Sequence, residues 1–128
     1  MGRAYGSGSG LVLVVDDEAD VRGLIVDVLQ CEGYEACAAR DGRAALAAAA
    51  RRPPDVVALE LVLHDADGVE VARQLLARAP RVRFVFVSAL LRRGAQAARQ
   101  FSAAFVPKPF RVDQLSTAVR DAFAASRA

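Results

Sequence analysis

The apolar residues of this chain follow two alternating patterns. Short continuous runs, rich in valine and other large aliphatic residues, are typical of strands buried on both faces of a sheet. Longer segments repeat apolar residues at every third or fourth position, as an amphipathic helix does. The segment after the first run shows this spacing most clearly, at Val21, Leu24, Ile25, Val28 and Leu29.

These patterns predict five strands, each followed by a helix. The expected strands cover residues 11–15, 34–39, 56–59, 82–87 and 104–106. The first helix ends at Gly33, and the other four are expected near residues 42–52, 69–79, 92–101 and 112–125. Such alternation predicts an α/β domain with a parallel sheet and helices on both of its faces.

The length of 128 residues fits one domain. The first ten residues, MGRAYGSGSG, are rich in glycine and serine, so we expect a flexible leader or linker there and the domain at 11–126. No apolar run is long enough to cross a membrane, and the N-terminus has no apolar signal segment. We therefore expect a cytoplasmic protein without membrane contact.

Composition and charge argue against three further possibilities: a disordered chain, a nucleic-acid-binding protein and a zinc site. A hydrophobic content of 54% excludes a disordered chain. With 17 basic and 15 acidic residues, the net charge of +2 is too balanced to indicate direct contact with nucleic acid. Cys31, Cys37 and the single His64 do not have the spacing of a zinc site.

Polar residues stand where the predicted strands end. Asp16 and Asp17 follow the first strand, Glu60 the third, Ser88 the fourth and Lys108 the fifth. In parallel sheets ligands bind outside these carboxyl ends, so we expect the five side chains to converge. Three carboxylates favour a divalent cation such as Mg²⁺, while an ammonium and a hydroxyl group can hold phosphoryl oxygens. Together they predict phosphoryl transfer to a carboxylate.

Five segments carry a family resemblance: LVLVVDDE, PDVVALEL, DADG, VSA and PKPF, in this order. The chain from Leu11 to about Ala125 resembles the receiver domain of two-component response regulators. The resemblance implies a flavodoxin-like, doubly wound five-stranded parallel sheet with strand order 2-1-3-4-5.

The resemblance also implies roles for individual residues. Asp16 and Asp17 match the acidic pair that binds Mg²⁺, with Glu60 and the backbone carbonyl of Val62 as further ligands. Ser88 and Lys108 match the residues that contact the phosphoryl group.

Two further positions match the family. Phe105 matches an aromatic residue that acts with Ser88 as a conformational switch. The Lys108–Pro109 peptide bond is cis in many members.

The chain departs from the family at the phosphoacceptor. The family has Asp there, and this chain has Glu60. One more methylene moves the carboxylate by about 1.5 Å, and a misplacement of about 1 Å can slow a reaction on the order of 10²-fold. We expect impaired phosphorylation, and a longer arm that reaches Lys108 or Ser88 and imitates the phosphorylated state. The substitution is either a natural loss of the acceptor, which other departures favour, or an engineered mimic.

The resemblance implies a signalling module and not an enzyme. Its partners would be a sensor histidine kinase or a phosphotransfer protein, and a homodimer could form through the face of the fourth helix, fifth strand and fifth helix. One alternative is a Mg²⁺-dependent phosphotransferase or phosphatase on the same fold, although Glu60 denies it a nucleophilic Asp. A nucleotide or flavin binder would need a phosphate-binding loop where Asp16-Asp17-Glu18 stands.

Overall fold

The computed structural model describes residues 10–127 and contains a five-stranded parallel sheet. Its strands lie in the order β2-β1-β3-β6-β7. This is the predicted order 2-1-3-4-5, counted over the strands of the main sheet. The strands are β1 (Leu11–Val15), β2 (Glu35–Ala39), β3 (Val56–Leu59), β6 (Arg83–Ser88) and β7 (Ala104–Pro107).

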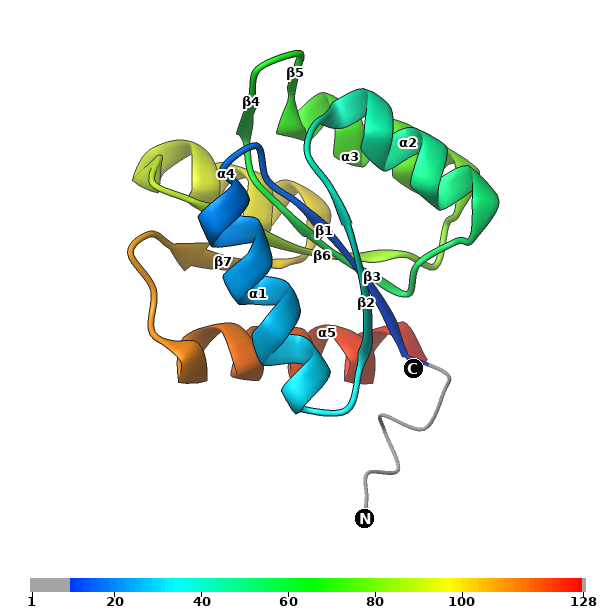
Figure 1. Cartoon of the computed structure of the whole chain (residues 1–128). Coiled ribbons are helices and arrows are strands. Elements are labelled where there is room, and N and C mark those ends of the chain that lie inside the picture. The colour runs from blue at the N-terminus through cyan, green and yellow to red at the C-terminus, as the bar shows by residue number, and fades with distance from the viewer. Residues whose placement is uncertain (1–9, 128) are drawn as a thin grey trace.

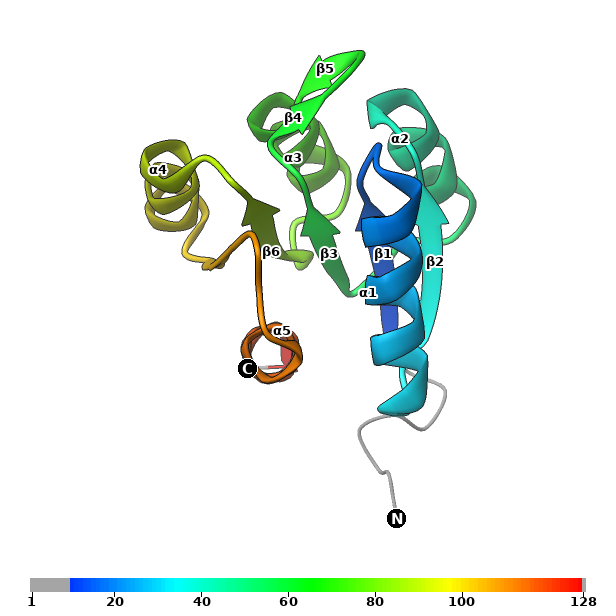
Figure 2. The ribbon, with the colours of Figure 1, turned by 60° about the vertical axis from the view of Figure 1, so that its left-hand side comes forward.

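Helices cover both faces of the sheet. Helices α1 and α5 lie on one face, and α2, α3 and α4 lie on the other (Figures 1 and 2). None of the helices in residues 10–127 is long and apolar enough to cross a membrane. The helices are α1 (Ala19–Cys31), α2 (Gly42–Arg51), α3 (Gly68–Arg78), α4 (Leu91–Phe101) and α5 (Val112–Arg127).

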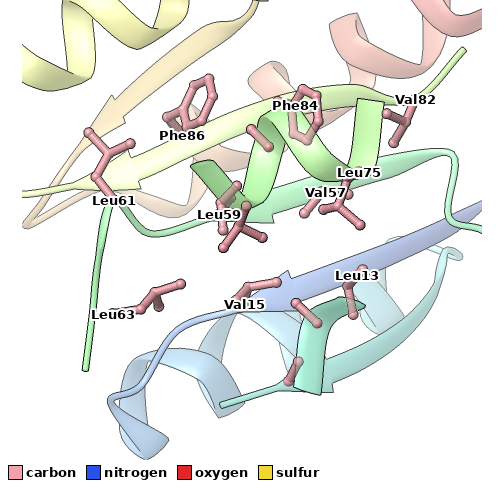
Figure 3. Close-up of a cluster of buried hydrophobic side chains, with 14 of the residues drawn as sticks. Leu13, Val15, Val57, Leu59, Leu61, Leu63, Leu75, Val82, Phe84 and Phe86 are labelled. Atoms are coloured by element: carbon pink, nitrogen blue, oxygen red, sulfur yellow. The ribbon is translucent and has the colours of Figure 1, made fainter. Parts of the chain in front are cut away.

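Each face of the sheet has its own apolar core. Successive side chains of a strand point to opposite faces, so Leu13 and Val15 enter one core while Val12 and Val14 enter the other. Figure 3 shows the first core, in which Leu59 of β3 and Phe86 of β6 lie on the face of the sheet that α2, α3 and α4 cover. Continuous apolar strand sequences are thus explained by burial on both sides.

The structure corrects two expectations at the edges of elements. Residues 62–67, expected as a loop, form an antiparallel hairpin of β4 (Val62–Leu63) and β5 (Ala66–Asp67). Two-residue strands are too short to produce a periodic pattern. Gly10, expected in the leader, is buried against Phe123 and accepts a hydrogen bond from the Glu35 N–H through its carbonyl. Residues 1–9, the rest of that leader, lie outside the described residues.

Gly68 brings the start of α3 against the end of β3. A Cβ atom at this position would lie 2.3 Å from the carbonyl oxygen of Glu60 and 2.7 Å from the Cα atom of Leu61. Both neighbours are backbone atoms, so they cannot move aside as a flexible side chain would. The Gly68 N–H donates to the Leu61 carbonyl at 2.7 Å. This close approach holds the backbone next to Glu60 in place.

Candidate functional site

Four of the five polar strand-end residues come together at the carboxyl edge of the sheet. Asp16, Glu60 and Ser88 are buried, with 1%, 7% and 1% of their surface exposed. Their strands are neighbours in the sheet, and β7 next to them carries Lys108 just beyond its end. The main chain continues the sheet pairing here, because the Lys108 N–H donates to the Ser88 carbonyl at 2.9 Å.

The Lys108 ammonium joins three carboxylates. Its Nζ atom donates to Asp16 Oδ2 and to Glu60 Oε1, each at 2.8 Å. A third, longer hydrogen bond reaches Glu18 Oε1 at 3.3 Å. An ammonium has three N–H donors, so these carboxylates use its full donor capacity.

Glu60 is held at both carboxylate oxygens. While Oε1 accepts from Lys108, Oε2 accepts from the backbone N–H groups of Leu61 at 2.5 Å and Val62 at 3.1 Å. Burial is the largest influence on the pKa of Glu60 and acts to raise it, but hydrogen bonds from Lys108, Ser88 and Val62 outweigh burial. The pKa of Glu60 therefore lies below its ordinary value, and the carboxylate is charged at neutral pH.

Asp16 is buried more deeply and behaves differently. Its Oδ1 atom accepts from the Glu18 N–H at 2.9 Å, and its backbone carbonyl accepts from the Arg22 guanidinium at 2.9 Å. Burial raises the pKa of Asp16 above its ordinary value, and the hydrogen bond from Lys108 offsets burial only in part. For Lys108, burial acts to lower the pKa, but the bonds to Asp16 and Glu60 outweigh it and raise the pKa.

Of the predicted metal ligands, Asp16 and Glu60 share the Lys108 ammonium, whereas Asp17 stands apart from it. Asp17 is exposed, and no hydrogen bond or ion pair links its side chain to residues 10–127. All four oxygens of Asp16 and Glu60 already accept hydrogen bonds, and the nearest cation is Lys108. Among the described residues, no three Asp, Glu, His or Cys side chains form a group that could hold a metal ion. In this arrangement Asp16 and Glu60 are neutralised by Lys108 and by backbone N–H groups, and Mg²⁺ binding by these residues stays a prediction.

Ser88 and Phe105, the predicted switch pair, occupy adjacent strands. The Ser88 hydroxyl accepts from the Leu90 N–H at 3.3 Å, and its interaction with Glu60 helps to lower the pKa of that carboxyl. Phe105 is half-buried, and its ring lies on Gly94 of α4, where a Cβ atom would approach the ring to 2.2 Å. The ring therefore occupies the space that a side chain at position 94 would fill. The Lys108–Pro109 bond is cis, as the resemblance implies.

Glu18 and Arg22 also belong to this site, although neither is among the site residues predicted from the sequence. Glu18 supplies the third carboxylate to Lys108, in the place expected for Asp17, and Arg22 binds the Asp16 carbonyl. The run Asp16-Asp17-Glu18 signals acidity at this turn. It does not show which carboxylate faces the lysine, because turn geometry decides that.

A family model for the response regulator receiver domain matches residues 12–120. The chain belongs to this family. It is 36% identical over 115 residues to the nitrogen assimilation regulatory protein NtrX of Azorhizobium caulinodans, an alignment covering 81% of this chain and 24% of NtrX. It is also 36% identical over 121 residues to the sensor kinase CckA of Brucella abortus, covering 90% of this chain and 13% of CckA.

Solved receiver structures agree with the fold. The receiver domain of NtrX from Brucella abortus superposes with a TM-score of 0.83 at 32% identity, covering 88% of this chain and 98% of that domain. A receiver domain from Clostridium thermocellum, at 20% identity, shares the fold with a TM-score of 0.85. The family and fold predictions are thus confirmed. The receiver spans about a quarter of the length of its NtrX relative.

Proposed function

We propose that this chain is a receiver module of two-component signalling whose state does not depend on phosphorylation. The observation that carries this proposal is the position of Glu60. The resemblance assigns its position to the phosphoacceptor, and its carboxylate is bound by Lys108 on one side and by the N–H groups of Leu61 and Val62 on the other. A fixed negative charge is thus bound by the lysine that the resemblance assigns to the phosphoryl group.

The same contacts argue against phosphoryl transfer. A phosphodonor must approach a free carboxylate oxygen in line, and both Glu60 oxygens are engaged and buried. The added methylene also shifts the attacking atom by about 1.5 Å, a displacement large enough to cost on the order of 10²-fold in rate. The module would therefore signal through its fixed conformation and catalyse no reaction of its own.

Partners are proposed from the family. A sensor histidine kinase, a phosphotransfer protein or an attached output domain would bind the module and respond to its conformation. The face of α4, β7 and α5 offers apolar contact area, since Leu91 of α4 is 65% exposed and Phe105 is half-buried beneath the same helix. The ammonium of Lys108 supplies the counter-charge inside the site, so the module would need no divalent cation to hold its state.

The experiment is phosphorylation by a small-molecule phosphodonor with magnesium, followed by intact mass. Wild type, Glu60→Asp and Glu60→Gln are treated in parallel. We expect the mass of one phosphoryl group to appear on Glu60→Asp only, because the shorter side chain restores the position of the attacking oxygen. Glu60→Gln is the matched control, since it has the length of Glu60 without a nucleophilic oxygen.

The same samples test the role of magnesium. We expect its addition to leave the melting temperature of the wild type unchanged. Wild type that gains a phosphoryl group as fast as Glu60→Asp would contradict the proposal.

A further inference from the structure

Charge is divided unevenly along the chain. Residues 71–112 carry nine basic residues and no acidic one, whereas residues 10–70 carry thirteen acidic and five basic residues. Helix α1 belongs to the acidic part, and the C-terminal end of α3 with the loop after it belongs to the basic part. Oppositely charged surfaces on one molecule allow copies of that molecule to attract each other.

The basic part contributes to an apolar groove between the C-terminal ends of α2 and α3, which we call the α2–α3 groove. Its volume is about 210 Å³, and it is lined mainly by Ala49, Pro53, Leu75, Ala79 and Val82. These residues precede β3 and β6, so the groove lies at the opposite end of the strands from Glu60.

Arginines surround this groove. Arg78 lines it, and the exposed Arg51 and Arg81 are sequence neighbours of lining residues. None of these three has an ion-pair partner within residues 10–127, whereas the adjacent Arg52 is paired with Glu35. The two segments that form the groove, 49–54 and 75–82, contain no acidic residue. The groove therefore fits an apolar side chain flanked by carboxylates.

Helix α1 presents this combination on its outer surface. Asp20, Leu24 and Asp27 are spaced by four and three residues and share one face of the helix, which we call the α1 ridge. Leu24 is 48% exposed, and the two exposed aspartates have no ion pair with the described residues. A Cβ atom at the neighbouring Gly23 would meet nothing within 4 Å, so the ridge is open to close approach.

We propose that the α1 ridge of one copy docks into the α2–α3 groove of a second copy. Leu24 enters the apolar groove, and the two aspartates approach Arg78 and its neighbours. Helix α1 lies on one face of the sheet, and α2 and α3, whose ends form the groove, lie on the other (Figure 2), so each copy can use both surfaces at once. Such a head-to-tail contact produces a chain or a ring of copies. Residues 1–9 are not the occupant, because they contain no acidic residue.

The contact is expected to be weak. It joins one leucine and a few exposed charges, which is a small interface of the transient kind. Exposed ion pairs contribute little and are screened by salt. We therefore expect a dissociation constant on the order of 0.1 mM at low salt and weaker association at high salt.

Sedimentation across a wide range of protein concentration tests the proposal. The wild type should grow beyond two copies as its concentration rises at low salt. Arg78→Glu in the groove and Asp27→Arg on the ridge should each weaken association by about threefold to fivefold. With both substitutions in one chain, the pair between copies is re-formed with reversed charges, so association should return.

The matched control is Arg92→Glu, which makes the same charge change on α4, away from both surfaces. It should associate as the wild type does, and circular dichroism of every variant should match the wild type. A wild type that stays monomeric would overturn the proposal, as would an assembly that stops at two copies. So would a double variant as weak as the single variants, or a loss in Arg92→Glu equal to that in Arg78→Glu.

Discussion

The candidate site of this receiver is centred on the carboxylate of Glu60. It accepts hydrogen bonds from a lysine and two backbone N–H groups while it is 7% exposed. Bonds to a charged group are stronger than those between neutral groups. The lowered pKa of Glu60 expresses this, because every donor favours the charged form. The residue therefore contributes both to the state of the site and to the stability of the fold.

This contribution should depend on pH. At neutral pH we expect Glu60→Gln to be less stable than wild type by about 2 kcal/mol, the scale of hydrogen bonds to a charged group. The folded pKa of Glu60 lies below its ordinary value of 4.5. The advantage is therefore present above about 4.5 and is lost as the pH falls through the folded pKa.

Urea unfolding of both proteins across the acid range measures this difference. Asp16 is present in both proteins, but the Glu60 charge contributes to its raised pKa, so the difference reports Glu60 together with its coupling to Asp16. A difference that stays constant down to strongly acidic pH would contradict the assignment.

At the scale of elements, the β4–β5 hairpin caps the N-terminus of α2. Asp65 of the hairpin accepts from the N–H groups of Gly42 at 2.9 Å and Arg43 at 3.0 Å, while Asp41 accepts from the Ala44 N–H at 2.8 Å. Two carboxylates thus satisfy three N–H groups that a helix leaves unpaired at its N-terminus. These bonds lower the pKa of Asp65. The hairpin joins the strand-end loop of Glu60 to the neighbouring helix.

Asp65→Ala should release this connection. We expect unfolding at a lower urea concentration, because a capping side chain is removed, and faster hydrogen exchange at the amides of Gly42 and Arg43. Asp41→Ala is the matched control, because it should speed exchange mainly at Ala44. Equal changes at all three amides in both variants would show that the helix start loosens as a unit, and the separate roles would be wrong.

At the scale of the whole molecule, the sheet joins two apolar cores into one unit. Leu59 is fully buried in the core that faces α2, α3 and α4. Successive residues of β3 alternate between this core and the core on the other face of the sheet. The aromatic rings of Phe84, Phe86 and Phe101 extend the first core toward α4, with ring centroids 5.4–5.9 Å apart. Loss of packing on one face of the sheet should therefore lower the stability of the whole domain.

Leu59→Ala should lower the free energy of unfolding by about 3 kcal/mol, since it leaves a cavity in a buried site. Unfolding should remain a single transition at a lower urea concentration, because the two cores share one sheet. Leu91→Ala is the control, as Leu91 is 65% exposed and its loss should change stability by less than about 0.5 kcal/mol. Far-UV circular dichroism in urea measures both, and two separate transitions in Leu59→Ala would contradict a common unit.

Local patterns along the chain are enough to predict the architecture and the edge of the sheet at which the candidate site lies. Strands buried on both faces and helices with one apolar stripe leave patterns that are local along the chain, so their order and approximate bounds can be recognised without a structure. The placement of Asp16, Glu60, Ser88 and Lys108 at one edge follows from the same order, because parallel strands end on the same side. Family motifs then assigned roles to these positions.

The tertiary structure alone decided how the side chains meet. Lys108 reaches Asp16 across 92 positions of the chain and Glu60 across 48, and no local pattern encodes which carboxylate such a side chain contacts. Turn geometry placed Glu18 beside the lysine and left Asp17 exposed. The hairpin of residues 62–67 and the burial of Gly10 likewise arise from contacts between distant segments. Periodicity reports which face of an element is buried, whereas hydrogen bonds and charges between elements depend on distances that only the folded chain defines.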